Sequence, residues 1–371
     1  METKAIGLYV HIPFCVKKCN YCDFCSFPYE HASWRSEYVD CLCKEIRGYK
    51  GKNICLNTIF FGGGTPSLLS PTEFKRIFSA IEESFVISPD TEFTIESNPK
   101  TIDADKISAY MDCGVNRISF GLQSIHKNEL KILGRIHNFQ EFLVSYNLAR
   151  DSGIKNVSID IMYGLPEQTL DSFSRTLERV IELNPDHISV YGLILEEGTP
   201  LYEVRSFIDF PSEDEECDMY YLAAEMLKTA GYNHYEISNY AKAGMESRHN
   251  LKYWHCDEYI GVGLAAYSYF EGKRFGNSDD SRAYLSADGA NYIRNEDDSD
   301  EKIEYVMLRL RLAEGFSISD YKNRFGVDFI SEHQDIINEL VKIGLVNLSD
   351  DRISLTEKGF YVSNSILAEF I

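Results

Sequence analysis

The sequence predicts an α/β fold, an incomplete (β/α)6 barrel that is followed by a C-terminal α+β region. Through the first half of the chain, about six short β-branched and aromatic runs alternate with amphipathic stretches. Strand and helix alternating at this interval are typical of βαβ units and a parallel sheet. No G-x-G-x-x-G turn follows the first run, so a barrel is favoured over a doubly wound dinucleotide-binding sheet. In such barrels, functional groups gather at the carboxyl ends of the strands.

The individual elements follow from this alternation. The predicted strands are 6–11, 58–61, 92–96, 116–120, 157–162 and 187–193. The predicted helices lie near 33–50, 71–84, 103–112, 138–152 and 169–183. Side chains that can accept a hydrogen bond from a free helical N–H mark several helix starts. They are Ser70 before Pro71, Thr101 before Asp103, and Thr169 with Asp171 and Ser172.

The character of the sequence changes after about residue 210. A helix is expected over 213–229 and a mixed segment follows to residue 269, whereas residues 277–301 are polar and acidic and predict an exposed connector. From residue 304 onward, three helical stretches precede two short alternating runs around Asp350 and Asp351, which predict a hairpin. Helices with such a hairpin indicate a winged-helix-like module. We therefore expect a partial barrel over 1–205, an extension over 206–300 and a winged-helix-like module over 301–371.

Composition excludes several function classes. Hydrophobic residues make up 44% of 371 residues, which is ample for a large core, and the net charge of −21 argues against nucleic acid and anionic membranes as partners. Winged-helix modules often bind DNA, but 301–371 carries 12 acidic and 8 basic residues, so a packing or partner role is favoured. No apolar run is long enough to span a bilayer and no signal peptide opens the chain, so we expect a cytoplasmic protein without stable membrane insertion. In that compartment ten cysteines do not imply disulfides.

Three cysteines in the run HIPFCVKKCNYCDF are the most informative feature. Cys15, Cys19 and Cys22 follow the first predicted strand with C-x3-C-x2-C spacing. Such a loop can bind three irons of a [4Fe-4S] cluster and leave the fourth without a protein ligand, and that iron is then a reaction site. The alternative is zinc, whose closed sites need four ligands, so Cys25 or His11 would have to join the three cysteines.

Further polar residues and a glycine run end the predicted strands. The second strand ends in FFGGGTPS, with Gly63, Gly64 and Thr65, and consecutive glycines let a ligand approach the backbone closely. Polar side chains at the ends of apolar parallel strands are expensive to bury without a partner. This rim suits a small zwitterionic nucleoside such as S-adenosylmethionine, because carboxylates can hold ribose hydroxyls or an amine and a guanidinium can pair with a carboxylate. The polar candidates are Glu96, Gln123, Arg135 and Asp160.

These segments resemble the radical S-adenosylmethionine proteins over nearly the entire chain. The cysteine triplet, GGGTP, ESNP, FGLQS and DIMYGLP are most similar to the branch that contains the oxygen-independent coproporphyrinogen III oxidase and the HemW-like haem chaperones. The resemblance implies that Cys15, Cys19 and Cys22 ligate the cluster, which donates one electron to the sulfonium and yields a 5′-deoxyadenosyl radical. It also implies a set of S-adenosylmethionine contacts. They are Tyr9, Gly63, Gly64, Thr65, Glu96, Gln123, Arg135 and Asp160.

Two features favour the chaperone over the oxidase. The oxidase carries a fourth cysteine two positions after the third, where this sequence has Phe24, and an additional segment before its cysteines, where this sequence has 14 residues. Downstream, His249-Asn250-x-x-Tyr253-Trp254 is similar to the HNxxYW motif of HemW-like proteins, which is implicated in haem binding. His249 offers an imidazole to haem iron, and in a helix Tyr253 would share its face. A hydrogen-bonded structural histidine is the alternative.

Three further residues keep alternative roles. Cys25 is an inert thiol, a cap on the resting cluster or a haem ligand, and His255 and Cys256 are secondary haem-ligand candidates.

The preferred function is haem binding and delivery, with a [4Fe-4S] cluster, S-adenosylmethionine and haem as cofactors. Its partners would be haem-recipient proteins and a reductant such as flavodoxin or ferredoxin. The alternatives are radical decarboxylation of coproporphyrinogen III propionates and anaerobic haem degradation by a radical methylase. Haem binding and delivery is a binding and transfer role on an enzyme scaffold, so no residue is assigned as catalytic.

Overall fold

The computed structural model describes residues 5–29, 33–287, 294–296 and 300–370, which form two compact units. The first unit comprises Met1–Ala223 and Glu258–Asp297, and the second comprises Ala224–Asp257 and Asp298–Ile371. The long helix α8 (Glu213–Thr229) contributes residues to both. Each unit is described separately below.

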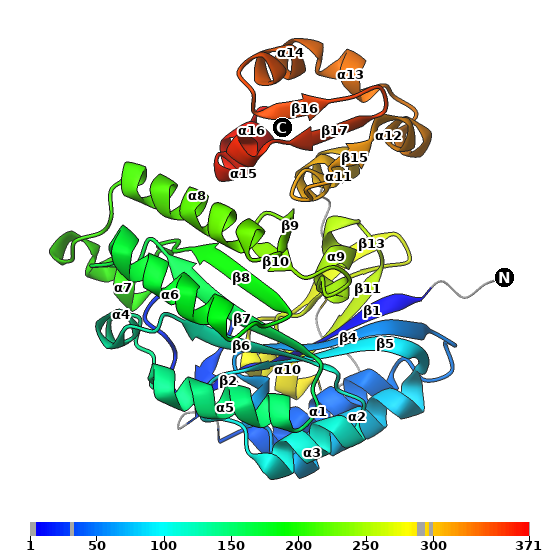
Figure 1. Cartoon of the computed structure of the whole chain (residues 1–371). Helices are drawn as coiled ribbons and strands as arrows, with labels where there is room; N and C mark the ends of the chain where they lie inside the picture. Colours follow the sequence, from blue (N-terminus) through cyan, green and yellow to red (C-terminus); the bar gives the residue numbers. More distant parts are fainter. Residues whose placement is uncertain (1–4, 30–32, 288–293, 297–299, 371) are drawn as a thin grey trace. The chain divides into compact units, whose positions relative to one another are not determined.

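Six parallel strands form the centre of the first unit (Figure 1). Each of the six predicted strands is present, so this part of the prediction is confirmed. In sheet order they are β1 (Ile6–Ile12), β4 (Cys55–Gly63), β5 (Val86–Ser97), β6 (Arg117–Gln123), β7 (Asn156–Tyr163) and β8 (His187–Gly192). In the described part of the chain β1 does not pair with β8, so the barrel is incomplete, as predicted.

A second set of strands extends the sheet beyond β1. β11 (Tyr259–Val262) runs parallel to β1, and three antiparallel strands continue from it. They are β12 (Tyr267–Phe270), β13 (Lys273–Asn277) and β14 (Arg294–Glu296). The helix α10 (Ser281–Ser286) lies where we expected an exposed connector over 277–301. Tyr284 of this helix is buried because its ring packs 5.4 Å from that of Tyr38 and its hydroxyl bonds Glu45, so this stretch is only partly exposed. Of the acidic run at 295–301, residues 297–299 lie outside the described residues.

Amphipathic helices cover one face of the parallel strands, and Figure 1 shows α1, α2, α3 and α5 along it. In α2, Phe74, Ile77 and Ile81 recur at helical spacing and are fully buried. Phe74 packs on Phe61 and Phe93 of the sheet, and burial of each such side chain contributes roughly 2 kcal/mol. The predicted helices correspond to α1 (Arg35–Arg47), α2 (Pro71–Ser84), α3 (Ala104–Asp112), α5 (Phe139–Asp151) and α6 (Leu170–Glu182).

Most of the expected helix caps are present. Ser70 and Thr169 each form a capping box. For α3 the cap is Asp103, which accepts from the N–H of Lys106, whereas Thr101 bonds Ser67 and the carbonyl of Asn98. The short helix α4 (Lys127–Ile132) was not predicted, because six residues are too few to reveal a periodicity.

The second unit contains short helices, an antiparallel strand pair and a three-stranded antiparallel sheet. Its elements are β9 (Asn233–Glu236), β10 (Asn239–Ala241), α9 (Arg248–Trp254), α11 (Glu301–Arg309), β15 (Phe316–Ser317), α12 (Ile318–Phe325), α13 (Phe329–Glu332), α14 (Gln334–Lys342), β16 (Val346–Leu348), β17 (Arg352–Leu355), α15 (Glu357–Tyr361) and α16 (Ser363–Ala368). β16 and β17 pair on either side of Asp350 and Asp351, which confirms the predicted hairpin. The rings of Tyr305, Phe316, Tyr321 and Phe329 pack on one another and form an aromatic cluster in this unit.

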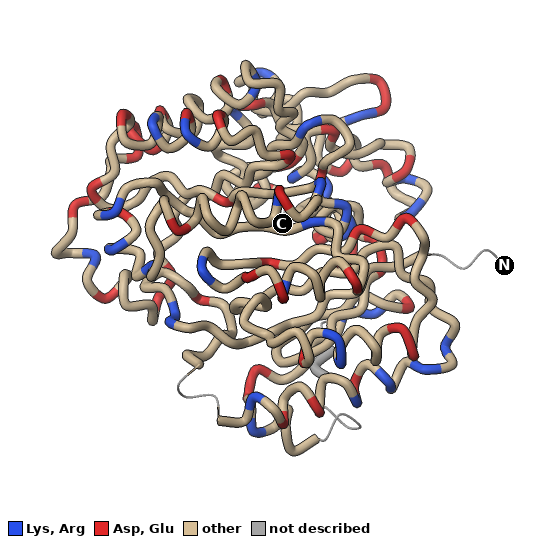
Figure 2. The backbone as a smooth tube through the Cα atoms, turned by 60° about the horizontal axis from the view of Figure 1, so that its bottom comes forward, with Lys and Arg blue, Asp and Glu red and all other residues tan. Residues whose placement is uncertain are grey.

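Acidic and basic residues are interspersed along the backbone in Figure 2. The sequence carries 58 Asp and Glu against 37 Lys and Arg. A search of the described residues finds no helix with the length and apolarity needed to span a bilayer.

Candidate functional site

The cysteine loop begins at the carboxyl end of β1 and is tied to the rest of the barrel. Cys15 is buried in the short strand β2 (Phe14–Cys15), and Cys19 and Cys22 are half-buried in the loop. Asn20, next to Cys19, donates from its backbone N–H to Leu133 at 2.9 Å and from Nδ2 to Ile132 at 2.8 Å. The loop is therefore held against the C-terminal end of α4 (Lys127–Ile132).

Both proposed fourth zinc ligands, His11 and Cys25, contact other groups of the chain in this arrangement. His11 donates from Nε2 to the carbonyl oxygen of Cys25 at 2.8 Å, so its Nδ1 accepts from the hydroxyl of Tyr9 at 3.0 Å. Burial lowers the pKa of His11 to about 4, which keeps the ring neutral. The thiol of Cys25 lies 3.9 Å from the carbonyl oxygen of Asp279. Among the described residues, no three His, Cys, Asp or Glu side chains are arranged to hold a single metal ion.

The chain itself fills the space beside the glycine run at the end of β4. A Cβ on Gly63 would lie 2.5 Å from the ring of His11, and one on Gly64 would lie 2.7 Å from the carbonyl oxygen of Phe14. Gly63 also has a φ of +109°, which side chains rarely allow. The glycines are thus needed for close packing of β4 against the end of β1, a reason that differs from the open approach expected from the sequence.

A chain of hydrogen bonds joins Thr65 and Arg135 to two of the cysteines. The hydroxyl of Thr65 lies 3.7 Å from Sγ of Cys15, and Nη1 of Arg135 lies 3.4 Å from Sγ of Cys19. Asn98 links them, because its Nδ2 donates to Thr65 Oγ1 at 2.7 Å and its Oδ1 accepts from Arg135 Nη2. Asn98 was not among the predicted site residues. Its position two residues after the third predicted strand, within ESNP, was the available signal.

Two carboxyl groups lie at the same end of the sheet, Glu96 on β5 and Asp160 on β7, with β6 between these strands. Glu96 accepts from the N–H of Gly63 at 3.2 Å, and Asp160 accepts from the hydroxyl of Ser119 at 3.1 Å. Desolvation and then the nearby carboxylate of Asp160 raise the pKa of Glu96 to about 8, and desolvation also raises that of Asp160. A neutral Glu96 can both donate a hydrogen bond to a ribose hydroxyl and accept one from it.

Gln123 occupies a strained position at the end of β6. Its φ is +70°, an uncommon conformation for a residue other than glycine. Its buried Oε1 has no hydrogen-bond partner among the residues the structure describes. Backbone strain and an unsatisfied buried acceptor both point to a ligand that donates a hydrogen bond here.

The first unit thus brings most of the predicted residues to one end of the sheet. Direct contacts join Tyr9 to His11, Gly63 to Glu96, Thr65 to Cys15 and Arg135 to Cys19. The side chains of Gln123 and Arg135 both lie close to Gly121. A Cβ at this glycine would lie 2.9 Å from Nε2 of Gln123 and 3.1 Å from Nη2 of Arg135.

His249 lies in the second unit, in α9. Ser247 caps this helix by accepting from the N–H of Asn250. Tyr253 is one turn from His249, as expected, and its hydroxyl lies 2.8 Å from Nε2 of the imidazole. His249 is 1% exposed, which fits the alternative of a hydrogen-bonded structural histidine in this state of the protein.

Comparison with known proteins shows which protein families this chain resembles. Residues 9–180 match the Radical SAM superfamily and residues 300–362 match the HemN C-terminal domain. The chain is 35% identical over 376 residues to heme chaperone HemW of Lactococcus lactis, which covers 100% of this chain and 98% of that protein. It is 34% identical to heme chaperone HemW of Bacillus subtilis, over 98% of both chains.

The chain belongs to the HemW family. Among solved structures it resembles coproporphyrinogen III oxidase (HemN) from Escherichia coli, with a TM-score of 0.85, 25% identity, and coverage of 99% of this chain and 90% of that one. The mixed α/β fold with a C-terminal domain is therefore common to the HemW-family chain and this structure.

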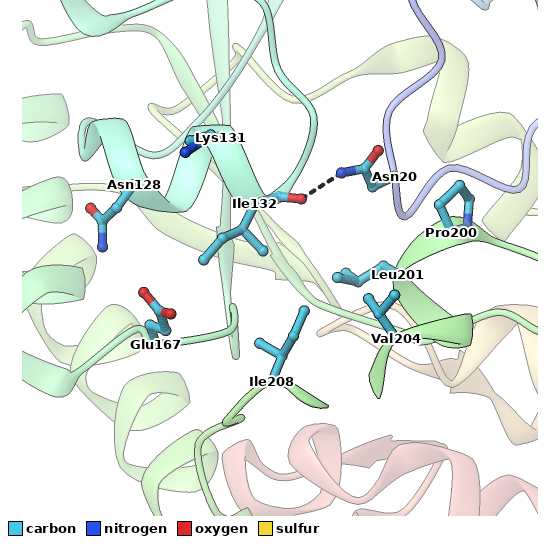
Figure 3. A pocket seen from close by; sticks show the side chains of 9 residues that line it. All are labelled: Asn20, Asn128, Lys131, Ile132, Glu167, Pro200, Leu201, Val204 and Ile208. Atoms are coloured by element: carbon cyan, nitrogen blue, oxygen red, sulfur yellow. Dashed lines mark hydrogen bonds between the residues drawn. The ribbon is translucent and has the colours of Figure 1, made fainter. Parts of the chain in front are cut away.

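A pocket that the sequence did not reveal lies beside the cysteine loop of this HemW-family chain. Its volume is about 340 Å³. Figure 3 shows Asn128, Lys131 and Glu167 toward one side and apolar side chains toward the other. The full lining is Asn20, Asn128, Lys131, Ile132, Glu167, Pro200, Leu201, Val204 and Ile208.

Proposed function

We propose that this chain is a haem chaperone, which binds haem and delivers it to proteins that require it. The observation that carries this proposal is its similarity along the whole chain to proteins named heme chaperone HemW, at 35% identity. The HNxxYW segment, which forms α9, supports it. The proposed partners are haem-recipient proteins and an electron donor such as flavodoxin or ferredoxin, and the proposed compartment is the cytoplasm.

Cys15, Cys19 and Cys22 are the proposed ligands of a [4Fe-4S] cluster. Their place on one pinned loop supports this, as does the Radical SAM superfamily match over residues 9–180. Both ring nitrogens of His11 are engaged, by Tyr9 and by the carbonyl oxygen of Cys25, so His11 would have to give up one of these hydrogen bonds to become a ligand. Three thiolates leave one iron open to a substrate or cofactor.

The polar strand ends are the proposed S-adenosylmethionine site. The unsatisfied Oε1 of Gln123 can accept from the ligand, and the neutral carboxyl of Glu96 can meet ribose hydroxyls. Nη2 of Arg135 is occupied by Asn98 and the carbonyl of Gly121, so a ligand carboxylate would share Nη1 with Cys19 or approach Nε. A reduced cluster held by the three cysteines would supply one electron to the sulfonium of this ligand. The proposed contacts are Tyr9, Gly63, Gly64, Thr65, Glu96, Gln123, Arg135 and Asp160.

His249 is the proposed haem ligand. Coordination through Nε2 would replace its hydrogen bond to Tyr253 with a bond to iron. Tyr253 and Trp254 add flat apolar surfaces suited to a porphyrin. His255 and Cys256 remain secondary candidates, and His255 is already within 3.3 Å of the carboxylate of Glu314.

The second candidate function is oxidation of coproporphyrinogen III. The likeness of the fold to the Escherichia coli enzyme favours it. Phe24 argues for the chaperone, because the oxidase pattern has a cysteine at this position.

Two measurements on anaerobically reconstituted full-length protein test these proposals. With reductant and S-adenosylmethionine, the protein should bind haem and leave coproporphyrinogen III unchanged, whereas formation of protoporphyrinogen IX would establish the oxidase. Addition of S-adenosylmethionine should alter the electron paramagnetic resonance spectrum of the reduced cluster. An unchanged spectrum would contradict an open iron.

A further inference from the structure

Asn98 lies at the centre of the hydrogen bonds that reach two of the proposed cluster ligands. We propose that Asn98 is a positioning residue that aims the Thr65 hydroxyl at Cys15 and the Arg135 guanidinium at Cys19, and thereby raises the reduction potential of the cluster. This inference rests on the proposed function, because it requires Cys15 and Cys19 to ligate iron.

The amide of Asn98 decides the direction of the Thr65 hydroxyl. A hydroxyl has one proton to donate, and Thr65 Oγ1 already accepts from Asn98 Nδ2 at 2.7 Å. The remaining proton points to Sγ of Cys15, 3.7 Å away. Thr65 is 2% exposed, so water does not compete for this proton.

The amide oxygen of Asn98 decides the orientation of Arg135. Nη2 of the guanidinium bonds both Asn98 Oδ1 and the carbonyl oxygen of Gly121. The guanidinium is planar, so holding one nitrogen directs the other. Nη1 consequently faces Sγ of Cys19 at 3.4 Å.

The backbone around Asn98 is itself fixed. Its carbonyl oxygen accepts from the N–H of Thr101 at 3.2 Å and from the Thr101 hydroxyl at 2.7 Å. Gly121 leaves space for the amide of Asn98, because a Cβ at position 121 would lie only 3.2 Å from Asn98 Oδ1. The backbone of Asn98 is thus held by contacts outside the cysteine loop, so its amide can fix the positions of Thr65 and Arg135 relative to the cysteines.

Hydrogen bonds to cluster sulfurs are among the factors that set reduction potential. Each donor stabilises the more negative, reduced cluster, and one donor here carries a full positive charge. Removing the donors should therefore lower the potential. Groups that donate hydrogen bonds to a metal ligand also orient that ligand. Removing these donors should therefore also reduce the amount of cluster that the protein retains.

The test is a redox titration of reconstituted full-length protein without S-adenosylmethionine, followed by electron paramagnetic resonance. Asn98→Leu, of similar size, should lower the midpoint potential of the cluster, and Thr65→Val should shift it in the same direction by a smaller amount. Because Asn98 acts partly through Thr65, the Asn98→Leu shift should be smaller in a Thr65→Val background. Thr65→Ser keeps the hydroxyl and should restore the parent potential.

Thr94→Val is the matched control. Thr94 is a buried strand hydroxyl that has no hydrogen-bond partner in the part of the chain that is described, so its removal should leave the potential unchanged. The inference would be overturned if the Asn98→Leu variant had the same midpoint potential as the parent protein. Fully additive shifts in the variant that combines Asn98→Leu with Thr65→Val would also overturn it. If Asn98→Leu does not fold, the Thr65→Val and Thr65→Ser pair still tests the contact with Cys15. A parent protein that takes up no cluster would instead remove the proposed function.

Discussion

The imidazole of His11 donates from Nε2 to the carbonyl oxygen of Cys25 at 2.8 Å. The end of the first strand thereby holds the far side of the loop that carries Cys15, Cys19 and Cys22. Tyr9, two residues earlier on the same strand, donates to the other ring nitrogen. One side chain thus couples a proposed S-adenosylmethionine contact to the proposed cluster loop.

Replacement of His11 by Ala should reduce both stability and iron uptake. It removes the hydrogen bond to the carbonyl oxygen of Cys25 and the one from the hydroxyl of Tyr9, and each lost hydrogen bond costs about 0.5–1.5 kcal/mol. Urea unfolding and iron content after reconstitution measure the two effects, and His11→Gln should recover part of both. His126→Ala is the control, since it removes a similar bond, from Nε2 to the carbonyl of Ser172, away from the cysteine loop. Unaltered iron uptake in His11→Ala would contradict the coupling.

Gly63→Ala should destabilise the protein more than Gly198→Ala. Both glycines have positive φ, so each substitution costs about 1–2 kcal/mol in backbone strain. Around Gly198 the described residues leave open space, whereas a Cβ at Gly63 would lie 2.5 Å from the ring of His11, which adds about 1–3 kcal/mol. Urea unfolding of both variants gives the difference directly. Equal losses would show that the His11 contact does not constrain Gly63.

Glu96 should make the cluster-free protein less stable as pH rises. Its folded pKa is about 8 against an ordinary value of 4.5, so between these values the folded state keeps a proton that the unfolded state has released. The free energy of unfolding of the parent, relative to Glu96→Gln, should therefore fall from about pH 4.5 to about 8 and then level off.

Glu141→Gln provides a control of opposite sign. A hydrogen bond from Lys100 lowers the pKa of Glu141, so its stabilising contribution is lost as the pH falls through that lowered pKa. Chemical denaturation over a pH series measures both variants. A difference between parent and Glu96→Gln that does not change with pH would contradict a raised pKa at Glu96.

His249→Ala should weaken haem binding at least about tenfold, because even residues that only support a metal ligand contribute about that much. An absorption titration with haem measures the affinity and the loss of the iron–imidazole spectrum. His126→Ala is the control, because His126 bonds the carbonyl of Ser172 outside the HNxxYW segment, and this variant should retain both. Parent-like affinity and spectrum in His249→Ala would eliminate His249 as the ligand.

The local elements were predictable because they depend on short-range patterns. The β-branched runs and the caps at Ser70 and Thr169 located the six strands and most of the helices. Caps depend on the final backbone turn, and for this reason Asp103 rather than Thr101 caps α3. The β16–β17 hairpin was predictable for the same reason, since alternation and turn residues are local signals.

The sequence by itself determined the number of βα repeats, the spacing of three cysteines on one loop and the polar residues that end the strands. Only the tertiary structure decided which of them touch. Asn98 meets Arg135 across 37 positions and Arg135 meets Cys19 across 116, and no local pattern encodes contacts at such separations. It also decided that β11 adds to β1, because backbone pairing between distant strands depends on how the whole sheet assembles.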